Sequence, residues 1–156
     1  MNTLFTIGYQ MRTLEEFVAL LREHHVGVLI DVRDAPWSHK PGFSKRPLEA
    51  ALREAGIEYV HAGFAGNPKS IRATAGPAWR VLEQYALHLD RNPHVDEQLA
   101  ALIERVAHRG RSACLACYER DPGACHRGVL AGRWAANGGG VVTHIDPYGA
   151  PRRAAS

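Results

Sequence analysis

Cysteine is scarce in this chain, with only three among its 156 residues. All three lie within residues 114–125, so they cannot crosslink distant parts of the chain as the disulfides of a small secreted domain do. Cysteines clustered in this way are typical of a reactive thiol site, a metal site or buried packing. The fold must therefore depend on a core of apolar side chains, and apolar residues make up 46% of the sequence.

The sequence also lacks any apolar run near the roughly 18 residues that a membrane-spanning helix needs. The first residues, Met1 to Phe5, have neither the basic start nor the apolar stretch of a signal peptide. We therefore expect a cytoplasmic protein with reduced thiols and no membrane partner. The net charge is only +3, so any contact with nucleic acid would depend on local clusters of arginine and lysine rather than on the total.

Short apolar segments alternate along the chain with segments of helical periodicity. Strands are predicted at residues 4–7, 26–31, 58–61, 112–117 and 141–145. Helices are predicted at residues 14–24, 47–55, 78–89, 96–108 and 126–137. This alternation predicts one α/β domain over residues 1–146, a Rossmann-like three-layer sandwich with a mostly parallel sheet of about five strands. A frayed tail is expected at residues 147–156.

Polar residues follow the predicted strands at their carboxyl ends. Ligands bind at this edge in open α/β sheets. The residues expected to line one pocket there are Asp31, Arg33, His61, Cys117, Glu119 and Arg127. Two of these assignments have simpler alternatives, because Asp31 would also suit a structural pair with Arg33, and an isolated histidine such as His61 more often satisfies a local hydrogen bond.

The strongest local signal runs from Cys114 to Arg127, from a buried strand through a polar turn into a helix start. The first amides and the dipole of such a helix favour an anion, and a cysteine beside them can have a lowered pKa and act as a nucleophile. Glu119 or His126 could transfer a proton. The catalytic candidates are Cys117, Glu119, Cys125 and His126. The substrate-binding candidates are Asp31, Arg33, Arg127 and His61.

A metal is the second interpretation of the same residues. Cys114 and Cys117 have the C-x-x-C spacing of zinc ligands, and Cys125 and His126 follow them. Residues three apart in a strand point to opposite faces, however, so Cys114 and Cys117 could share a metal only if the strand ended before Cys114. Cys114 is therefore expected to be an inert packing residue, no residue is assigned as a metal ligand, and no cofactor is inferred.

The sequence resembles the domain-of-unknown-function 488 family over roughly residues 4–146. The resemblance is most specific in Cys117-x-Glu119-x-Asp121-Pro122-x-x-Cys125-His126-Arg127. Further matching segments are 6–9, 13–17, 29–33 with Pro36, 43–44 and 56–59. Residues 62–67 depart from the Leu-Gly-Gly-like segment usual after the third strand, and Cys114 lies outside the family pattern. The resemblance implies the fold and the site, and it carries no established activity.

Three functions remain open on these residues. The first is a thiol-dependent enzyme that uses Cys117 or Cys125 on an anionic substrate, such as a nucleotide or a nucleic acid. The second is a non-catalytic nucleic-acid-binding or regulatory module. Its cations and stacking side chain would be Lys45, Arg46, Lys69, Arg72 and Trp79. The third is a domain with a structural metal at the cysteine cluster. The oligomeric state is left open.

Overall fold

The protein contains one five-stranded parallel sheet, seen in a computed structural model that describes residues 2–147. Its strands are β1 (Asn2–Gly8), β2 (Val28–Asp31), β3 (Glu58–His61), β4 (Ala113–Cys117) and β5 (Gly140–His144). They lie in the order β3-β2-β4-β1-β5, and every neighbouring pair is parallel. The frayed tail predicted from residue 147 onward falls, from residue 148, outside the described residues.

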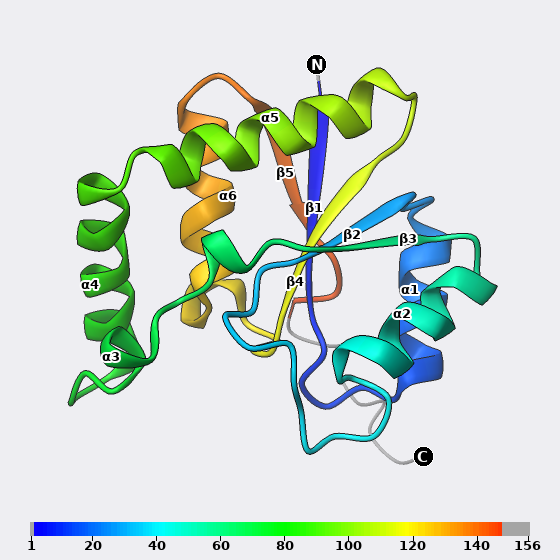
Figure 1. The fold of residues 1–156 in the computed structure, drawn as a ribbon, viewed down its shortest axis with the longest axis horizontal. Coiled ribbons are helices and arrows are strands. Elements are labelled where there is room, and N and C mark those ends of the chain that lie inside the picture. Colours follow the sequence, from blue (N-terminus) through cyan, green and yellow to red (C-terminus); the bar gives the residue numbers. More distant parts are fainter. Residues whose placement is uncertain (1, 148–156) are drawn as a thin grey trace, which may run out of the picture.

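Helices cover both faces of this sheet (Figure 1). Those packed on one face are α1 (Leu14–Glu23) and α2 (Lys45–Glu54). Those packed on the other are α4 (Ala78–Arg91), α5 (His94–His108) and α6 (His126–Ala136). Three short elements complete the fold: η1 (Gly63–Ala65), α3 (Lys69–Arg72) and η2 (Pro122–Ala124). The predicted Rossmann-like three-layer architecture is confirmed.

Local sequence signals explain where the first two helices begin. The Thr13 hydroxyl accepts a hydrogen bond from the amide of Glu16, which caps α1 as a threonine before a helical segment should. Helix α2 begins at Lys45, two residues before the predicted start at Pro47. Proline fits the third helical position because the first amides of a helix have no intrahelical acceptor.

Strand β4 divides its side chains between two cores, as a period of two requires. Ala113, Leu115 and Cys117 belong to the core beneath α4, α5 and α6. Cys114 and Ala116 belong to the core beneath α1 and α2. Cys114 and Cys117 therefore point to opposite faces of the sheet, as predicted, and they cannot act together.

The strand register brings the carboxyl ends of distant segments together. Gly8 of β1 lies beside Cys117 of β4, while Asp31 of β2 lies between Ala116 and His61 on its two neighbours. Helices α1 and α2 lie on one face and the later helices on the other, so the chain changes face after β3. Ligands bind outside the carboxyl ends of the strands at such a change of connection.

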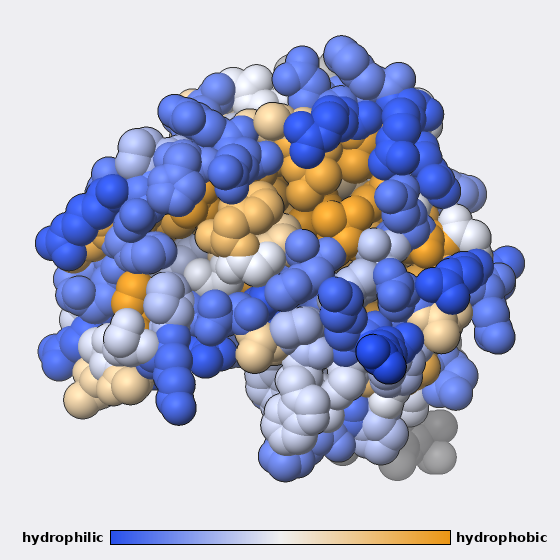
Figure 2. All heavy atoms as spheres, in the orientation of Figure 1, coloured by the Kyte–Doolittle hydropathy of each residue, from blue (hydrophilic) through white to orange (hydrophobic). Residues whose placement is uncertain are grey.

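The surface seen in the orientation of Figure 1 is mainly hydrophilic at its rim, and apolar side chains are visible in a hollow below α5 (Figure 2). Within residues 2–147, no helix combines the length and the apolar character needed to cross a membrane.

Gly8 should be intolerant of a side chain because β1 approaches the turn after β4 closely. A Cβ atom at Gly8 would lie 1.9 Å from the carbonyl oxygen of Glu119. We expect Gly8→Ala to lower the free energy of unfolding by ~1–3 kcal/mol, as overpacking does. Gly132→Ala is the matched control, since its Cβ would meet nothing within 4 Å in α6. Alanine there should raise stability by up to ~1 kcal/mol. Equal urea midpoints for Gly8→Ala and the wild type would contradict this packing.

Candidate functional site

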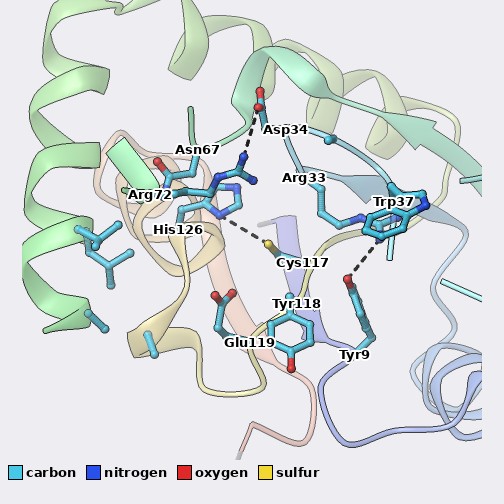
Figure 3. Close-up of a pocket in the computed structure, with 15 residues that line it drawn as sticks. Tyr9, Arg33, Asp34, Trp37, Asn67, Arg72, Cys117, Tyr118, Glu119 and His126 are labelled. Atoms are coloured by element: carbon cyan, nitrogen blue, oxygen red, sulfur yellow. Dashed lines mark hydrogen bonds and ion pairs between the residues drawn. The ribbon is translucent and has the colours of Figure 1, made fainter. Parts of the chain in front are cut away.

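Cys117 and His126 face each other where β4 ends and α6 begins (Figure 3). The Cys117 Sγ atom lies 3.6 Å from Nδ1 of His126, and both residues are buried. The opposite ring nitrogen, Nε2, lies 2.7 Å from the carbonyl oxygen of Val32. A carbonyl only accepts hydrogen bonds, so Nε2 must carry a proton, and Nδ1 of the neutral ring is an acceptor aimed at the thiol.

Cys125, the N-cap of α6, is the second thiol of the site. One ligand atom each from Cys117, Cys125 and His126 lie within 4.8 Å of one another. Burial tends to raise the pKa of Cys125. A hydrogen bond from Cys117, the hydrogen bond and charge of His126 in its protonated form, and the charge of Arg127 bring it well below its ordinary value. The pKa of Cys117 is raised, because it hydrogen-bonds to Cys125 and is itself buried. The pair therefore favours one negative charge on Cys125 and a proton on Cys117.

Glu119 supplies a proton donor near this pair. Burial and the negative charge of Cys125 raise the pKa of Glu119 to about 7. At neutral pH its carboxyl group is thus present in both protonation states, which suits transfer of a proton to or from a reacting group.

Arg127 lies behind the site and holds the turn between β4 and η2. Its side chain is fully buried, and its guanidinium donates to the carbonyl oxygens of Glu119 and Arg120. Among the described residues, its Nε atom has no hydrogen-bond acceptor. Arg127 does not line the cavity beside Cys117. It acts on the site through its positive charge and by positioning Glu119.

Asp31 and Arg33 form a buried ion pair under the same edge of the sheet. The Asp31 carboxylate accepts from Nη2 of Arg33 at 2.8 Å and from the Tyr59 hydroxyl at 2.6 Å. Arg33 also donates from Nη1 to the Phe43 carbonyl at 2.6 Å. Nε2 of His61 lies 2.9 Å from the carbonyl oxygen of Arg33. These contacts indicate that Asp31 and His61 position Arg33, which itself reaches the cavity.

A cavity of about 350 Å³ opens over Cys117 (Figure 3). The predicted site residues that line it are Arg33, Cys117, Glu119 and His126. Those that lie outside its lining are Asp31, His61, Cys125 and Arg127. The cavity is therefore lined by only some of the residues predicted to share one pocket. The others lie below its surface, where they bond to neighbouring groups of the protein. The catalytic and substrate-binding roles given to these residues stay predictions.

Further residues, most of them in loops, complete the cavity, and the sequence pattern predicts few of them. They include Tyr9, Asp34, Trp37, Asn67, Arg72 and Tyr118. Arg72 had been selected only as a nucleic-acid contact. A tryptophan inside a polar loop is a sequence feature that could have marked Trp37 as a site residue. No such feature marks Asn67.

Cys117, Cys125 and His126 could also hold a metal ion. Their ligand atoms are close enough to share one, and the hydrogen bond from Nε2 to the Val32 carbonyl is the arrangement usual for a metal-binding histidine. Cys114 cannot join them, since it faces the other core. A structural metal site with all three cysteines, the predicted alternative, is therefore reduced to Cys117, Cys125 and His126. Three protein ligands with one open coordination position are typical of catalytic zinc sites.

The fold and this site together define an α/β protein with a buried Cys–Cys–His cluster beneath a cavity at the carboxyl edge of a parallel sheet. A family model described as "Domain of unknown function DUF488" matches residues 13–134. The chain belongs to this family, which confirms the resemblance seen in the sequence. Neither a curated protein nor a solved structure gives a match.

The raised pKa of Glu119 predicts that stability falls as pH rises toward neutrality and levels off above it. An unfolded glutamate has a pKa of about 4.3, whereas the pKa of Glu119 in the folded protein is about 7. Between these values the folded state holds a proton that the unfolded state has lost, so ionisation opposes folding as pH increases. Urea unfolding of Glu119→Gln at pH values between ~5 and ~8 should show a flatter dependence than the wild type.

Glu83→Gln is the control for this experiment, because Glu83 is an exposed residue of α4. Its pH profile of stability should match that of the wild type. An unchanged slope in Glu119→Gln would mean that Glu119 titrates as an ordinary surface carboxylate.

Proposed function

We propose that the protein is a thiol-dependent enzyme that acts on an anionic substrate, with Cys117 as the nucleophile and His126 as its base. The observation that carries this proposal is the oriented pair: Nδ1 of His126 lies 3.6 Å from Cys117 Sγ, while Nε2 is held by the Val32 carbonyl. Among the three cysteines, Cys117 is the one in the cavity lining. A nucleophile paired with an oriented base is the usual arrangement for covalent catalysis.

The proton of Cys117 has two acceptors, Nδ1 of His126 and Sγ of Cys125. Once the proton leaves, the Cys117 thiolate attacks an electrophilic atom of the substrate. A sulfur–substrate bond forms, and the bond to the leaving group breaks. The protonated carboxyl of Glu119, on the same cavity wall, gives its proton to the leaving group. A second nucleophile such as water then frees Cys117.

Positive charge near the cavity supports an anionic substrate. Arg72 lines the cavity, and its partner Asp34 is 3.9 Å away with both side chains partly exposed. Such a pair is weak, so Arg72 can exchange Asp34 for another anion. The charge of Arg127 and the amino-terminal end of α6 lie on the side of Cys125.

The non-catalytic nucleic-acid module has less support from the same geometry. Lys45, Arg46, Lys69 and Trp79 are exposed, and none of them lines the cavity at Cys117. The three-ligand cluster favours a metal as the second candidate, in which the thiols would bind the ion and lose their reactivity.

Alkylation by iodoacetamide tests the proposed nucleophile in the reduced, metal-free protein. We expect Cys117, the cysteine in the cavity lining, to react at a rate that depends on His126, with Cys114 silent because it is fully buried on the other face. His126→Gln keeps a donor toward the Val32 carbonyl and removes Nδ1. It should slow labelling of Cys117 by about tenfold or more, as loss of a general base does. Peptide mass spectrometry locates the label.

His108→Gln is the control, since His108 is exposed at the end of α5. It should label Cys117 at the wild-type rate. The thiol proposal would be abandoned for the metal if Cys117 is labelled as fast in His126→Gln as in the wild type, or if stoichiometric zinc protects the cysteines until it is chelated.

A further inference from the structure

Asn67 is a buried polar side chain without a partner in the wall of the cavity. Its side chain belongs to a residue that is 6% exposed, and no donor among residues 2–147 reaches its Oδ1 atom. A buried acceptor that makes no hydrogen bond destabilises the protein, and such groups are uncommon without a water, an ion or another partner. Asn67 is thus a polar residue in the wall of the cavity, next to Arg72.

The residues before Asn67 hold it firmly in place. A Cβ atom at Gly66 would lie 2.5 Å from the Cα atom of Asp34, so the two loops touch through their backbones. The carbonyl of Ala65 accepts a hydrogen bond from the Tyr85 hydroxyl at 2.7 Å. The loop is thus fixed against the segment after β2 and against α4, which presents the Asn67 amide at a defined position.

Two exposed aromatic rings border the same cavity. Trp37 is 62% exposed and Tyr118 is 44% exposed, and both line it. Tyr9 stacks on Phe43 and packs edge-on against Tyr118 with ring centroids 5.3 Å apart, which supports the exposed ring from below. Exposed aromatic rings beside a cavity provide a surface on which a planar ring can stack.

Arg72 and Asn67 lie on one side of Cys117, and the aromatic rings lie on the other (Figure 3). The other charged groups in the lining are Arg33, neutralised by Asp31, and the acids Asp34 and Glu119. A phosphate at Arg72 would displace the Asp34 carboxylate, which holds the guanidinium only weakly at 3.9 Å. Arginine binds phosphate through paired hydrogen bonds, which favours this exchange.

We infer that the cavity binds a nucleotide unit, with its base against Trp37 and Tyr118 and its phosphate on Arg72, beside Asn67. This inference rests on the proposed function, because it takes the cavity over Cys117 as the substrate site. A volume of about 350 Å³ lies at the small end of ligand pockets and suits one unit. The unit is either a free mononucleotide or the terminal nucleotide of a single strand.

Calorimetric titration of the reduced protein tests the inference. The ligands are the four ribonucleoside 5′-monophosphates, the corresponding nucleosides, ribose 5-phosphate and a short 5′-phosphorylated single strand. At least one nucleotide, free or terminal, should bind about tenfold or more tightly than ribose 5-phosphate, which lacks the base; tenfold corresponds to about 1.4 kcal/mol. Tight binding of the strand alone would identify the terminal nucleotide as the source, and tight binding of the free nucleotide would identify the small molecule.

Variants assign each contact. Trp37→Ala should weaken nucleotide binding about tenfold, within the range for the loss of one stacked base. Asn67→Leu should also weaken it, because it removes a polar group beside the phosphate. Arg72→Gln should weaken the nucleotide and leave the nucleoside unchanged. The matched controls are Trp79→Ala and Arg80→Gln, an exposed tryptophan and arginine outside the cavity lining, and both should bind as the wild type does. Because Trp37 is largely exposed, its replacement tests the site even if Asn67→Leu does not fold.

The inference is overturned if no nucleotide, free or terminal, binds better than ribose 5-phosphate, or if Trp79→Ala weakens binding as much as Trp37→Ala. Alkylation of Cys117 separates this failure from failure of the proposed function. If labelling of the wild type still depends on His126, the thiol site stands and only the ligand assignment is lost. If that dependence is absent, the proposed function fails whatever the titrations give.

Discussion

The site depends on one hydrogen bond, from Nε2 of His126 to the carbonyl oxygen of Val32 at 2.7 Å. It joins the first residue of α6 to the chain just after β2, across the crevice at the edge of the sheet. It also determines the ring's proton, since a carbonyl leaves Nε2 as the donor and directs the lone pair of Nδ1 toward Cys117. Without this bond, Nδ1 would no longer be directed at Cys117, and the buried thiol would lose its nearby base.

A second layer of charged residues supports this arrangement from beneath. Arg127 binds the carbonyls of the turn that carries Glu119, while Asp31 and His61 hold the side chain and the backbone of Arg33. Buried charges need such partners, because removal from water penalises an unpaired ion heavily. These hydrogen bonds and ion pairs hold the residues below the cavity in fixed positions. The cavity lining also holds two exposed aromatic rings and the weak ion pair between Asp34 and Arg72, whose partners a ligand can replace.

The sequence predicted the sheet and its two covering layers because apolar strands and amphipathic helices leave periodic signals. The period of two also placed Cys114 and Cys117 on opposite faces. The strand-end rule brought Cys117 and Glu119 to one edge. It could not separate Arg33, which reaches the cavity, from Asp31, which lies beneath it, since that depends on side-chain pairing. Asn67 and Trp37 lie in loops, where no periodicity marks a residue that tertiary packing turns toward a site.

The most direct test of the proposed site is to determine which ring nitrogen of His126 carries the proton. Nitrogen NMR of the histidine rings distinguishes the two neutral tautomers, and His126→Gln assigns the signal by its disappearance. We predict that the neutral ring of His126 carries its proton on Nε2, and that Cys117→Ser shifts the resonance of Nδ1. A neutral ring protonated on Nδ1, or an Nδ1 signal that ignores the loss of the Cys117 sulfur, would contradict an oriented base facing a thiol.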